Sequence, residues 1–414
     1  MKAHIVGGGL AGLSAAVSLT SLGAEVVVYE AAGQAGGRCR SYYDAVMDGV
    51  IDNGNHLVLS GNTAVAGYLK TIGAHDALIG PDQAEFHFAD LQSGARWLLR
   101  PNEGPFPWWI FSESRRVPGT SPMDYVKLAN LLAAGPAARV EDLIPCEGPL
   151  WERLMRPFLV AVMNTEPEKS SARLAGAVLK ETLAKGGRAY CPRIAHPTLA
   201  AAFVEPALQY LTAQRGMVHF GQRLRRLAFE SGRVSVLEFP ENKVVIAPED
   251  RVVLAVPPWV AHDLVPGLSA PTEFRSIVNA HFKVPAPAGT PLMQGLINSA
   301  AEWVFAFPDR ISVTVSAADG IVDRDREDLA RLLWTDVAKT LNLPTELPVW
   351  QIVKEKRATF AATPEQDALR PDTKTAYSNL VLAGDWTQTG LPSTIEGALR
   401  SGQKAALVCR SPSV

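Results

Sequence analysis

The stretch AHIVGGGLAGLSAAVSLTSLGAEVVVYE, residues 3–30, decides the fold. It predicts a strand, a glycine turn, a helix and a second strand. Gly7, Gly9 and Gly12 fill the G-x-G-x-x-G pattern, which gives a tight turn, lets a pyrophosphate approach the backbone and lets the helix pack closely. Glu30 ends the second strand, where an acid can accept hydrogen bonds from a ribose. The stretch therefore predicts a dinucleotide site, and the carboxylate disfavours a 2′-phosphate as in NADP.

The next stretch, EAAGQAGGRCRSYYDAVMDGVIDNGNH at residues 30–56, favours FAD over NAD. Gly36, Gly37 and Arg38 would place flexible backbone and a cation beside the same pyrophosphate. An NAD dehydrogenase usually enters another helix here. This chain instead predicts a β-hairpin that turns at Asp48-Gly49.

A second strand, loop and helix start occurs late in the chain, as LAGDWTQTGLPSTIEGALRSG at residues 382–402. Together with the opening motif and G-G-R, it resembles the flavin amine oxidase and phytoene desaturase superfamily. The resemblance implies that the late AGD segment closes the FAD site: Gly384 and Asp385 would meet the ribityl or pyrophosphate region. It also implies that Thr394 and Ile395, at the helix start, lie near the flavin ring.

A third piece of the cofactor site is expected in GMVHFGQRLRRLAFESGRVSVLEF at residues 216–239. The resemblance implies that the backbone of Arg223 or Leu224 touches adenine here. The loop between Ala383 and Ala398 holds no cysteine. We therefore expect non-covalent FAD.

The fold class expected is α/β, with a discontinuous Rossmann-like FAD-binding domain and an α+β substrate domain whose mixed sheet is covered by helices. The FAD-binding domain should comprise residues 1–80, 213–265 and 375–414. The substrate domain takes residues 81–212 and 266–374. Its apolar helical runs suit either an oily channel or an ordinary core, and periodicity does not separate the two.

Composition narrows the kinds of partner that the protein is expected to bind. The formal net charge is −2, with no run of basic residues, so nucleic-acid binding is not expected. The four cysteines are far apart in the sequence and predict no metal site. No apolar stretch is long enough to cross a bilayer, and we expect a cytoplasmic protein. The aromatics before Arg115 and Arg116, in a segment near 105–117, fit either contact with the inner face of the cytoplasmic membrane or a core cluster.

Several segments resemble one branch of the superfamily, the hydroxysqualene dehydroxylases of hopanoid synthesis: DNGNHLVLSGN (52–62), PFPWW (105–109), LVAVMNTEPEKSSARL (159–174) and TGLPSTIEGA (389–398). One departure is Asn55, where glutamine is expected before the histidine. The resemblance implies a C30 isoprenoid substrate. Its allylic hydroxyl would leave as water, and hydride from reduced FAD would quench the cation. The electron donor is unidentified.

A departing hydroxyl needs a proton or a polarising donor. His56 is the first candidate for this acid, because the pKa of histidine lies near working pH. Glu396 and Asp52 are weaker candidates, since a carboxylate at a helix start or strand end often has a structural role.

Three other functions remain open. A polyprenoid desaturase would use the same flavin with hydride flowing from substrate to FAD. An amine oxidase needs aromatic rings at the flavin face, for which the late loop offers only Trp386. A flavin-holding lipid-binding protein without turnover is the fourth reading, and reduction of the bound flavin by dithionite would argue against it.

Overall fold

Three segments that are far apart in the sequence form one parallel sheet. The computed structural model describes residues 1–410, and its sheet has the strand order β10-β2-β1-β14-β20 with every pair parallel. The strands are short and mostly buried, as expected for a parallel sheet covered on both faces. Their bounds are β1 (Lys2–Val6), β2 (Glu25–Tyr29), β10 (Met217–His219), β14 (Arg251–Leu254) and β20 (Leu380–Leu382).

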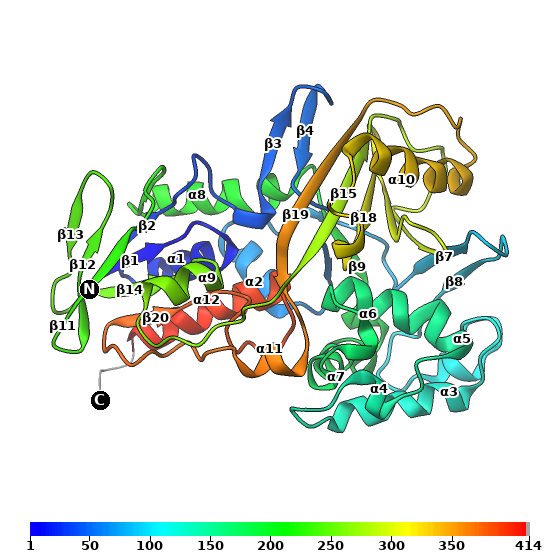
Figure 1. The fold of residues 1–414 in the computed structure, drawn as a ribbon, viewed down its shortest axis with the longest axis horizontal. Helices are drawn as coiled ribbons and strands as arrows, with labels where there is room; N and C mark the ends of the chain where they lie inside the picture. The colour runs from blue at the N-terminus through cyan, green and yellow to red at the C-terminus, as the bar shows by residue number, and fades with distance from the viewer. Residues whose placement is uncertain (411–414) are drawn as a thin grey trace.

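The last helix packs directly on the first. Helix α1 (Leu10–Ser21) and helix α12 (Ile395–Arg410) lie side by side beneath the parallel sheet (Figure 1). A Cβ atom added to Gly402 would lie 2.3 Å from the carbonyl oxygen of Ala11, so only glycine allows this approach. The Ser14 hydroxyl donates to the carbonyl of Leu399 at 2.8 Å. The C-terminal segment is thereby fixed to the opening unit.

Other elements complete this side of the molecule. Helices α2 (Thr63–Thr71) and α8 (Glu205–Ala213) contact α1. Because α8 packs here, we propose moving the domain boundary predicted at residue 213 to before α8; the division into domains stays a prediction. A three-stranded sheet contains β11 (Arg226–Glu230), β12 (Arg233–Glu238) and β13 (Lys243–Val245), and α9 (Pro258–Leu264) follows β14.

The predicted hairpin is present, but its turn differs. Strands β3 (Ser41–Asp44) and β4 (Gly49–Asp52) pair antiparallel, with Asp44 opposite Gly49. The turn therefore consists of residues 45–48, and the prediction that Asp48-Gly49 forms it is wrong. Asp48 is left-handed, with a φ of 44°, so Asp48 rather than the glycine supplies the unusual backbone conformation.

The second part of the molecule is built on a seven-stranded mixed sheet, which confirms the predicted class. Its order is β19-β15-β18-β17-β16-β7-β8, with only the β16–β7 pair parallel. Helix α10 (Arg326–Leu341) covers one face (Figure 1). The strands are β7 (Phe86–Asp90), β8 (Arg96–Leu99), β15 (Phe274–Phe282), β16 (Met293–Ile297), β17 (Trp303–Ala306), β18 (Ile311–Val315) and β19 (Trp350–Phe360).

A group of helices lies beside the opposite face of this sheet. One apolar cluster joins Trp303 and Phe305 of β17 to Met155, Leu159 and Met163 of the helical group. The helices are α3 (Pro122–Val126), α4 (Val140–Leu143), α5 (Gly148–Leu150), α6 (Arg156–Met163) and α7 (Ala172–Glu181). A small sheet of β5 (Leu57–Leu59), β9 (Pro192–Ala195) and β6 (Leu78–Ile79) and the short α11 (Pro364–Ala368) lie nearby.

Candidate active site

The glycine turn after β1 has the geometry that the sequence predicts. Gly7 has a φ of 108°, and a Cβ atom there would lie 2.3 Å from the carbonyl oxygen of Ala255. A Cβ on Gly12 would lie 1.9 Å from the carbonyl oxygen of Gly7. Gly9 precedes α1, whose N-terminus has no side-chain cap and no acidic residue in its first turn. The N–H groups of this turn are thus suited to bind an anion.

Glu30 and the predicted adenine loop lie together. The carboxylate oxygens of Glu30 accept hydrogen bonds from the backbone N–H groups of Gly8 at 2.6 Å and Ala32 at 2.7 Å. The N–H of Gln222 donates to the carbonyl of Glu30 at 2.8 Å. This bond brings the loop that contains the buried Leu224 beside the acid. The carboxylate has further lone pairs for ribose hydroxyls.

Arg38 links the first and last pieces of the site. Its Nη2 atom donates to Oδ1 of Asp385 at 2.6 Å, and Nη1 donates to the carbonyl of Ala358 at 2.5 Å. Burial raises the pKa of Asp385, but the charge and hydrogen bond of Arg38 outweigh this and hold the pKa below its usual value. Asp385 is therefore a buried carboxylate whose partner comes from the glycine-rich loop.

The residues fit a dinucleotide with a pyrophosphate. Gly37 lies against Gly9, because a Cβ added to Gly37 would lie 3.3 Å from the Cα of Gly9. The N–H of Gly36 donates to the carbonyl of Gly8 at 2.8 Å. The two glycine turns thus lie together at the uncapped α1 terminus, and the predicted contacts of these residues and Arg38 with a pyrophosphate stay predictions.

The start of α12 is organised by Thr394. Its hydroxyl accepts a hydrogen bond from the N–H of Gly397 at 3.0 Å, so Thr394 caps the helix. Ile395 follows and is buried. Ser393 contributes to the lowered pKa of Asp385, which places this loop near the AGD segment. The predicted contacts of Thr394 and Ile395 with the flavin ring stay predictions.

Glu396 has a structural setting. It is buried, and its carboxylate accepts hydrogen bonds from the N–H groups of Ala64 at 3.1 Å and Val65 at 3.0 Å, in the first turn of α2. Arg400 donates to it at 2.7 Å. Glu396 thus caps a helix more than three hundred residues earlier in the chain, and we do not propose it as the acid.

Asp52 also has structural partners. Its Oδ1 atom accepts from the Ser41 hydroxyl at 2.6 Å and from the N–H of Leu199 at 2.9 Å. Burial raises its pKa, while these bonds and the charge of Arg310 act in the opposite direction. The side chain ties the hairpin to residue 199, which favours a structural role.

His56 differs from its prediction. Burial and the nearby charge of Arg38 lower its pKa to about 4, although a hydrogen bond to the Arg38 backbone acts in the opposite direction. The expectation of a pKa near working pH is therefore wrong. At neutral pH the ring is neutral and is a weak proton donor, so we propose that His56 positions the loop around Arg38.

The sequence predictions missed a line of polar side chains on β15 and β18. The Thr314 hydroxyl donates to Oδ1 of Asn279 at 2.7 Å, and Asn55 donates to Thr314 at 3.1 Å. Further along, Nε2 of His281 donates to the carbonyl of Asp52 at 3.0 Å, and Nδ1 lies 2.8 Å from the Ser312 hydroxyl. The line connects the loop beside His56 to the face of the sheet opposite α10.

A signal for this line exists in the sequence. In ISVTVS, residues 311–316, Ser312, Thr314 and Ser316 alternate with apolar residues, and all three are buried. Strict alternation usually indicates a strand with one solvated face. Here the polar face is covered by the rest of the protein, so it indicates an internal polar surface.

The aromatic segment near 105–117 is divided between core and surface. Trp109 and Ile110 are buried, and Trp109 packs edge-on against Tyr125 of α3. Large apolar side chains from this segment and α3 are nevertheless exposed, and we call them the apolar surface: Phe106 (68%), Trp108 (47%), Phe111 (61%), Met123 (66%) and Val126 (58%). The Arg115 guanidinium lies 4.7 Å from the centroid of the Trp108 ring.

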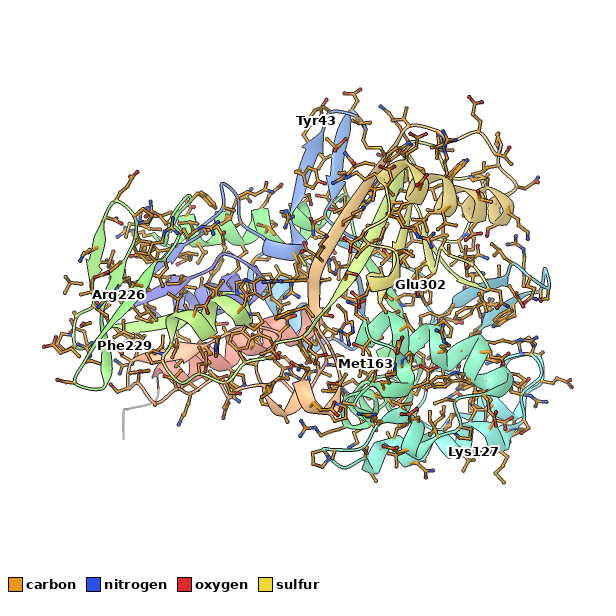
Figure 2. The ribbon with its side chains drawn as sticks, viewed as in Figure 1. Tyr43, Lys127, Met163, Arg226, Phe229 and Glu302 are labelled. Carbon is orange, nitrogen blue, oxygen red and sulfur yellow. The ribbon has the colours of Figure 1, made fainter. Side chains whose placement is uncertain are left out.

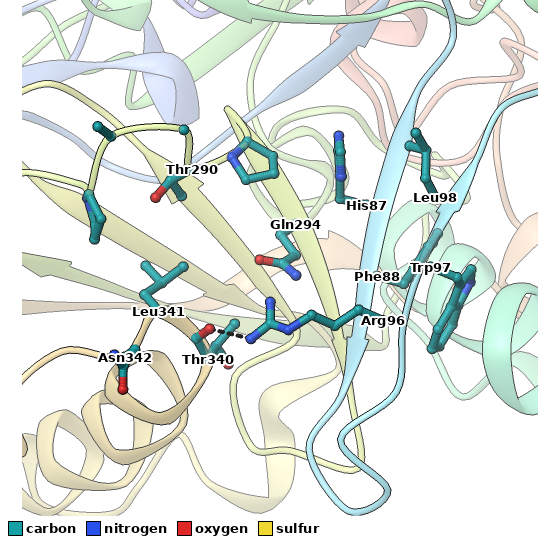
Figure 3. A pocket seen from close by; sticks show the side chains of 14 residues that line it. His87, Phe88, Arg96, Trp97, Leu98, Thr290, Gln294, Thr340, Leu341 and Asn342 are labelled. Atoms are coloured by element: carbon teal, nitrogen blue, oxygen red, sulfur yellow. Dashed lines mark hydrogen bonds between the residues drawn. The ribbon is translucent and has the colours of Figure 1, made fainter.

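A cavity of about 550 Å³ lies between β7, β8 and the end of α10 (Figure 3). Its lining includes His87, Arg96 and Gln294, and Arg96 donates to the carbonyl of Thr340 at the end of α10. None of the predicted flavin residues lines it. Phe88 and Trp97 also line this cavity.

Comparison with known proteins agrees with this site. The chain matches the family model described as "Flavin containing amine oxidoreductase" over residues 10–409. It is 52% identical over 404 residues to a hydroxysqualene dehydroxylase from Rhodopseudomonas palustris, covering 97% of each chain. It is 49% identical to another from Sinorhizobium fredii, again over 97% of each chain. A protein described as "Probable zeta-carotene desaturase" from Synechococcus elongatus is 24% identical over 98% of each chain.

Solved structures share the fold. A putrescine oxidase variant aligns with a TM-score of 0.73 and 16% identity, covering 99% of this chain and 98% of its own. Fold and site together define an FAD-dependent oxidoreductase. The chain belongs to the flavin-containing amine oxidoreductase family and, within it, to the hydroxysqualene dehydroxylases. Across residues 1–410, no helix is long and apolar enough to cross a membrane.

Proposed function

We propose that this protein reductively removes the hydroxyl of hydroxysqualene to give squalene and water. The observation that carries the proposal is the 45–52% identity to hydroxysqualene dehydroxylases along 97% of the chain. Bound reduced FAD supplies a hydride to the allylic carbon that loses the hydroxyl. Arg38, Asp385 and the glycine turns hold the cofactor and fix its orientation.

The protein must exclude water from the allylic cation, because water would trap the cation again. The apolar cluster between the seven-stranded sheet and the helical group provides a setting of this kind, with Trp303 and Phe305 on the sheet and Met163 on α6. Aromatic faces can also stabilise a passing positive charge. The substrate is thus expected to lie between the sheet and the helices.

The second candidate is a polyprenoid desaturase, favoured by the 24% identity to the carotene desaturase. It would use the same flavin and the same apolar space, with hydride moving from substrate to FAD. An amine oxidase is weaker. Trp386, its expected aromatic residue, is buried and donates its indole N–H to the carbonyl of Val256 at 3.0 Å. This fixed hydrogen bond favours a structural role for the ring.

The experiment that separates these functions uses anaerobic, dithionite-reduced protein. After excess reductant is removed, hydroxysqualene is added, flavin absorbance is followed and the lipids are extracted. Reoxidation of the flavin with formation of an equal amount of squalene is expected. Unchanged hydroxysqualene, together with reduction of the oxidised flavin by phytoene or squalene, would establish the desaturase instead.

We also propose that the apolar surface rests on a membrane from which the lipid substrate enters. Five exposed apolar side chains lie in the segment near 105–117 and in α3, with Arg115, Arg116 and Lys127 nearby as cations and Glu113 and Asp124 as acids. Apolar groups with flanking cations suit an anionic bilayer surface.

Sedimentation with vesicles containing phosphatidylglycerol tests this proposal. The double substitution F111S/M123S should reduce binding, whereas V245S, at an exposed site on β13, should not. Equal binding by all three proteins would exclude this surface.

A further inference from the structure

Glu302 lies at the inner end of the polar line on the seven-stranded sheet. Its Oε2 atom accepts a hydrogen bond from the N–H of Ser316 at 2.7 Å, and within residues 1–410 no hydrogen bond to its Oε1 atom is found. Ser316 continues the alternation of Ser312 and Thr314, and Thr314 pairs with Trp303 in the sheet. Trp303, the residue after Glu302, is therefore paired with Thr314, which accepts the hydrogen bond from Asn55.

The helical group lies close to Glu302. Figure 2 shows Glu302 where the sheet approaches α6. The charged group that acts on it is Arg156 of α6, whose Nε atom lies 3.8 Å from the Glu168 carboxylate. Glu302 is half-buried by surface area and forms none of the ion pairs found within residues 1–410. It is thus a carboxyl in apolar surroundings with one hydrogen bond to the backbone.

The neighbouring aromatic cluster contains unpaired donors. Trp97 and Phe88 stack with ring centroids 5.5 Å apart, and Trp303 meets Phe88 edge-on at 5.8 Å. The buried indole N–H groups of Trp97 and Trp303 have no hydrogen-bond partner within the described chain. Buried donors without partners are rare in folded proteins and call for an explanation. An oxygen-bearing ligand beside this cluster would provide one.

We propose that the carboxyl of Glu302 protonates the departing hydroxyl of the substrate and that the cluster of Phe88, Trp97 and Trp303 surrounds the resulting cation. The inference rests on the proposed function. It replaces His56, Glu396 and Asp52 with a residue that directly precedes β17.

The step balances as follows. The O–H proton of Glu302 moves to the hydroxyl oxygen, the allylic C–O bond breaks with its electron pair going to oxygen, and water leaves. The cation then accepts a hydride from reduced FAD, which becomes oxidised. Glu302 regains its proton from solvent. Burial raises the pKa of Glu302 to about 7, although the Ser316 hydrogen bond and Arg156 act in the opposite direction. The acid form is therefore present below about pH 7 and is lost above it.

The test compares the wild-type holoenzyme with E302Q, E302D and the exposed-loop control E346Q. In single turnovers with reduced protein, E302Q should react about 10²- to 10⁴-fold more slowly, as expected for loss of a general acid. The fall in rate that wild type shows above neutral pH should disappear. E302D should recover part of the rate, and E346Q should match wild type. FAD content should be equal in all four proteins.

A second readout does not depend on turnover. Infrared difference spectra between pH 6 and pH 8 should show the carbonyl band of a protonated carboxyl in wild type and E346Q, and E302Q should lack it. An E302Q protein with wild-type rate and pH profile would overturn the role of Glu302 while leaving the proposed function intact. A wild-type protein that forms no squalene from hydroxysqualene would instead overturn the proposed function itself.

Discussion

The two large sheets of this protein differ in where their polar groups lie. The parallel sheet has apolar strands and leaves recognition to the glycine turns and helix ends at its edge. The seven-stranded sheet has one apolar face under α10 and an opposite face with buried His281, Asn279 and Thr314. The predicted cofactor contacts thus lie at strand ends, whereas the proposed substrate contacts lie in the middle of a sheet.

Substitution of Gly12, where α1 closely approaches the turn after β1, should have the largest effect on FAD binding. In G12A the new Cβ would lie 1.9 Å from the carbonyl oxygen of Gly7, so α1 must shift and the anion site is lost. We expect G12A to purify without FAD. G67A is the matched control, because a Cβ at Gly67 in α2 meets nothing within 4 Å. Flavin absorbance per mole of protein measures the outcome, and a fully loaded G12A protein would contradict the packing argument.

Removing the ion pair of the cofactor site should have the next largest effect. R38A leaves the Asp385 carboxylate buried without its cation. Loss of one partner of such a pair costs about 3 kcal/mol, or about 10²-fold in the dissociation constant for FAD. Titration of deflavinated protein with FAD measures the change. R40A is the control, because Arg40 donates only to the carbonyl of Gly37; equal weakening in both variants would remove the special role of Arg38.

Substitution of Glu396 tests whether this residue has a structural or a catalytic role. E396A leaves the first N–H groups of α2 without their acceptor and removes one of the two carboxylates bound to Arg400, the other being that of Glu181. We expect a loss of about 2 kcal/mol in the free energy of unfolding. The rate per FAD-loaded molecule should stay near that of wild type. A stable E396A protein with intact FAD but no turnover would restore Glu396 as a candidate acid.

The polar face predicts an effect on stability that is small near neutral pH and grows as the pH falls. Burial, followed by the charge of Arg310, lowers the pKa of His281 to about 4. Between pH 6.5 and 4 the unfolded chain therefore binds more protons than the folded one, so stability falls as the pH falls through this window. The contribution is about 1.4 kcal/mol per pH unit. Urea unfolding of wild type and H281Q should show a shallower pH dependence for H281Q. Parallel curves would mean that His281 is protonated in the folded protein.

The cofactor side was predictable because its signals are local. The spacing of Gly7, Gly9 and Gly12, the acid at residue 30 and the G-G-R segment each report a backbone requirement that few residue types satisfy. The same signals do not show which side chains face one another across the fold. Glu396 and Asp52 were therefore read as candidate acids, although their partners are backbone groups of distant segments.

The sequence by itself determined the cofactor class, the discontinuous parallel sheet and the branch of the family, because glycines at close contacts occur at fixed spacings that can be recognised without coordinates. Tertiary structure alone decided the protonation of His56 and the surroundings of Glu302. A pKa depends on burial and on charges brought close by folding, and the spacing of residues along the chain determines neither.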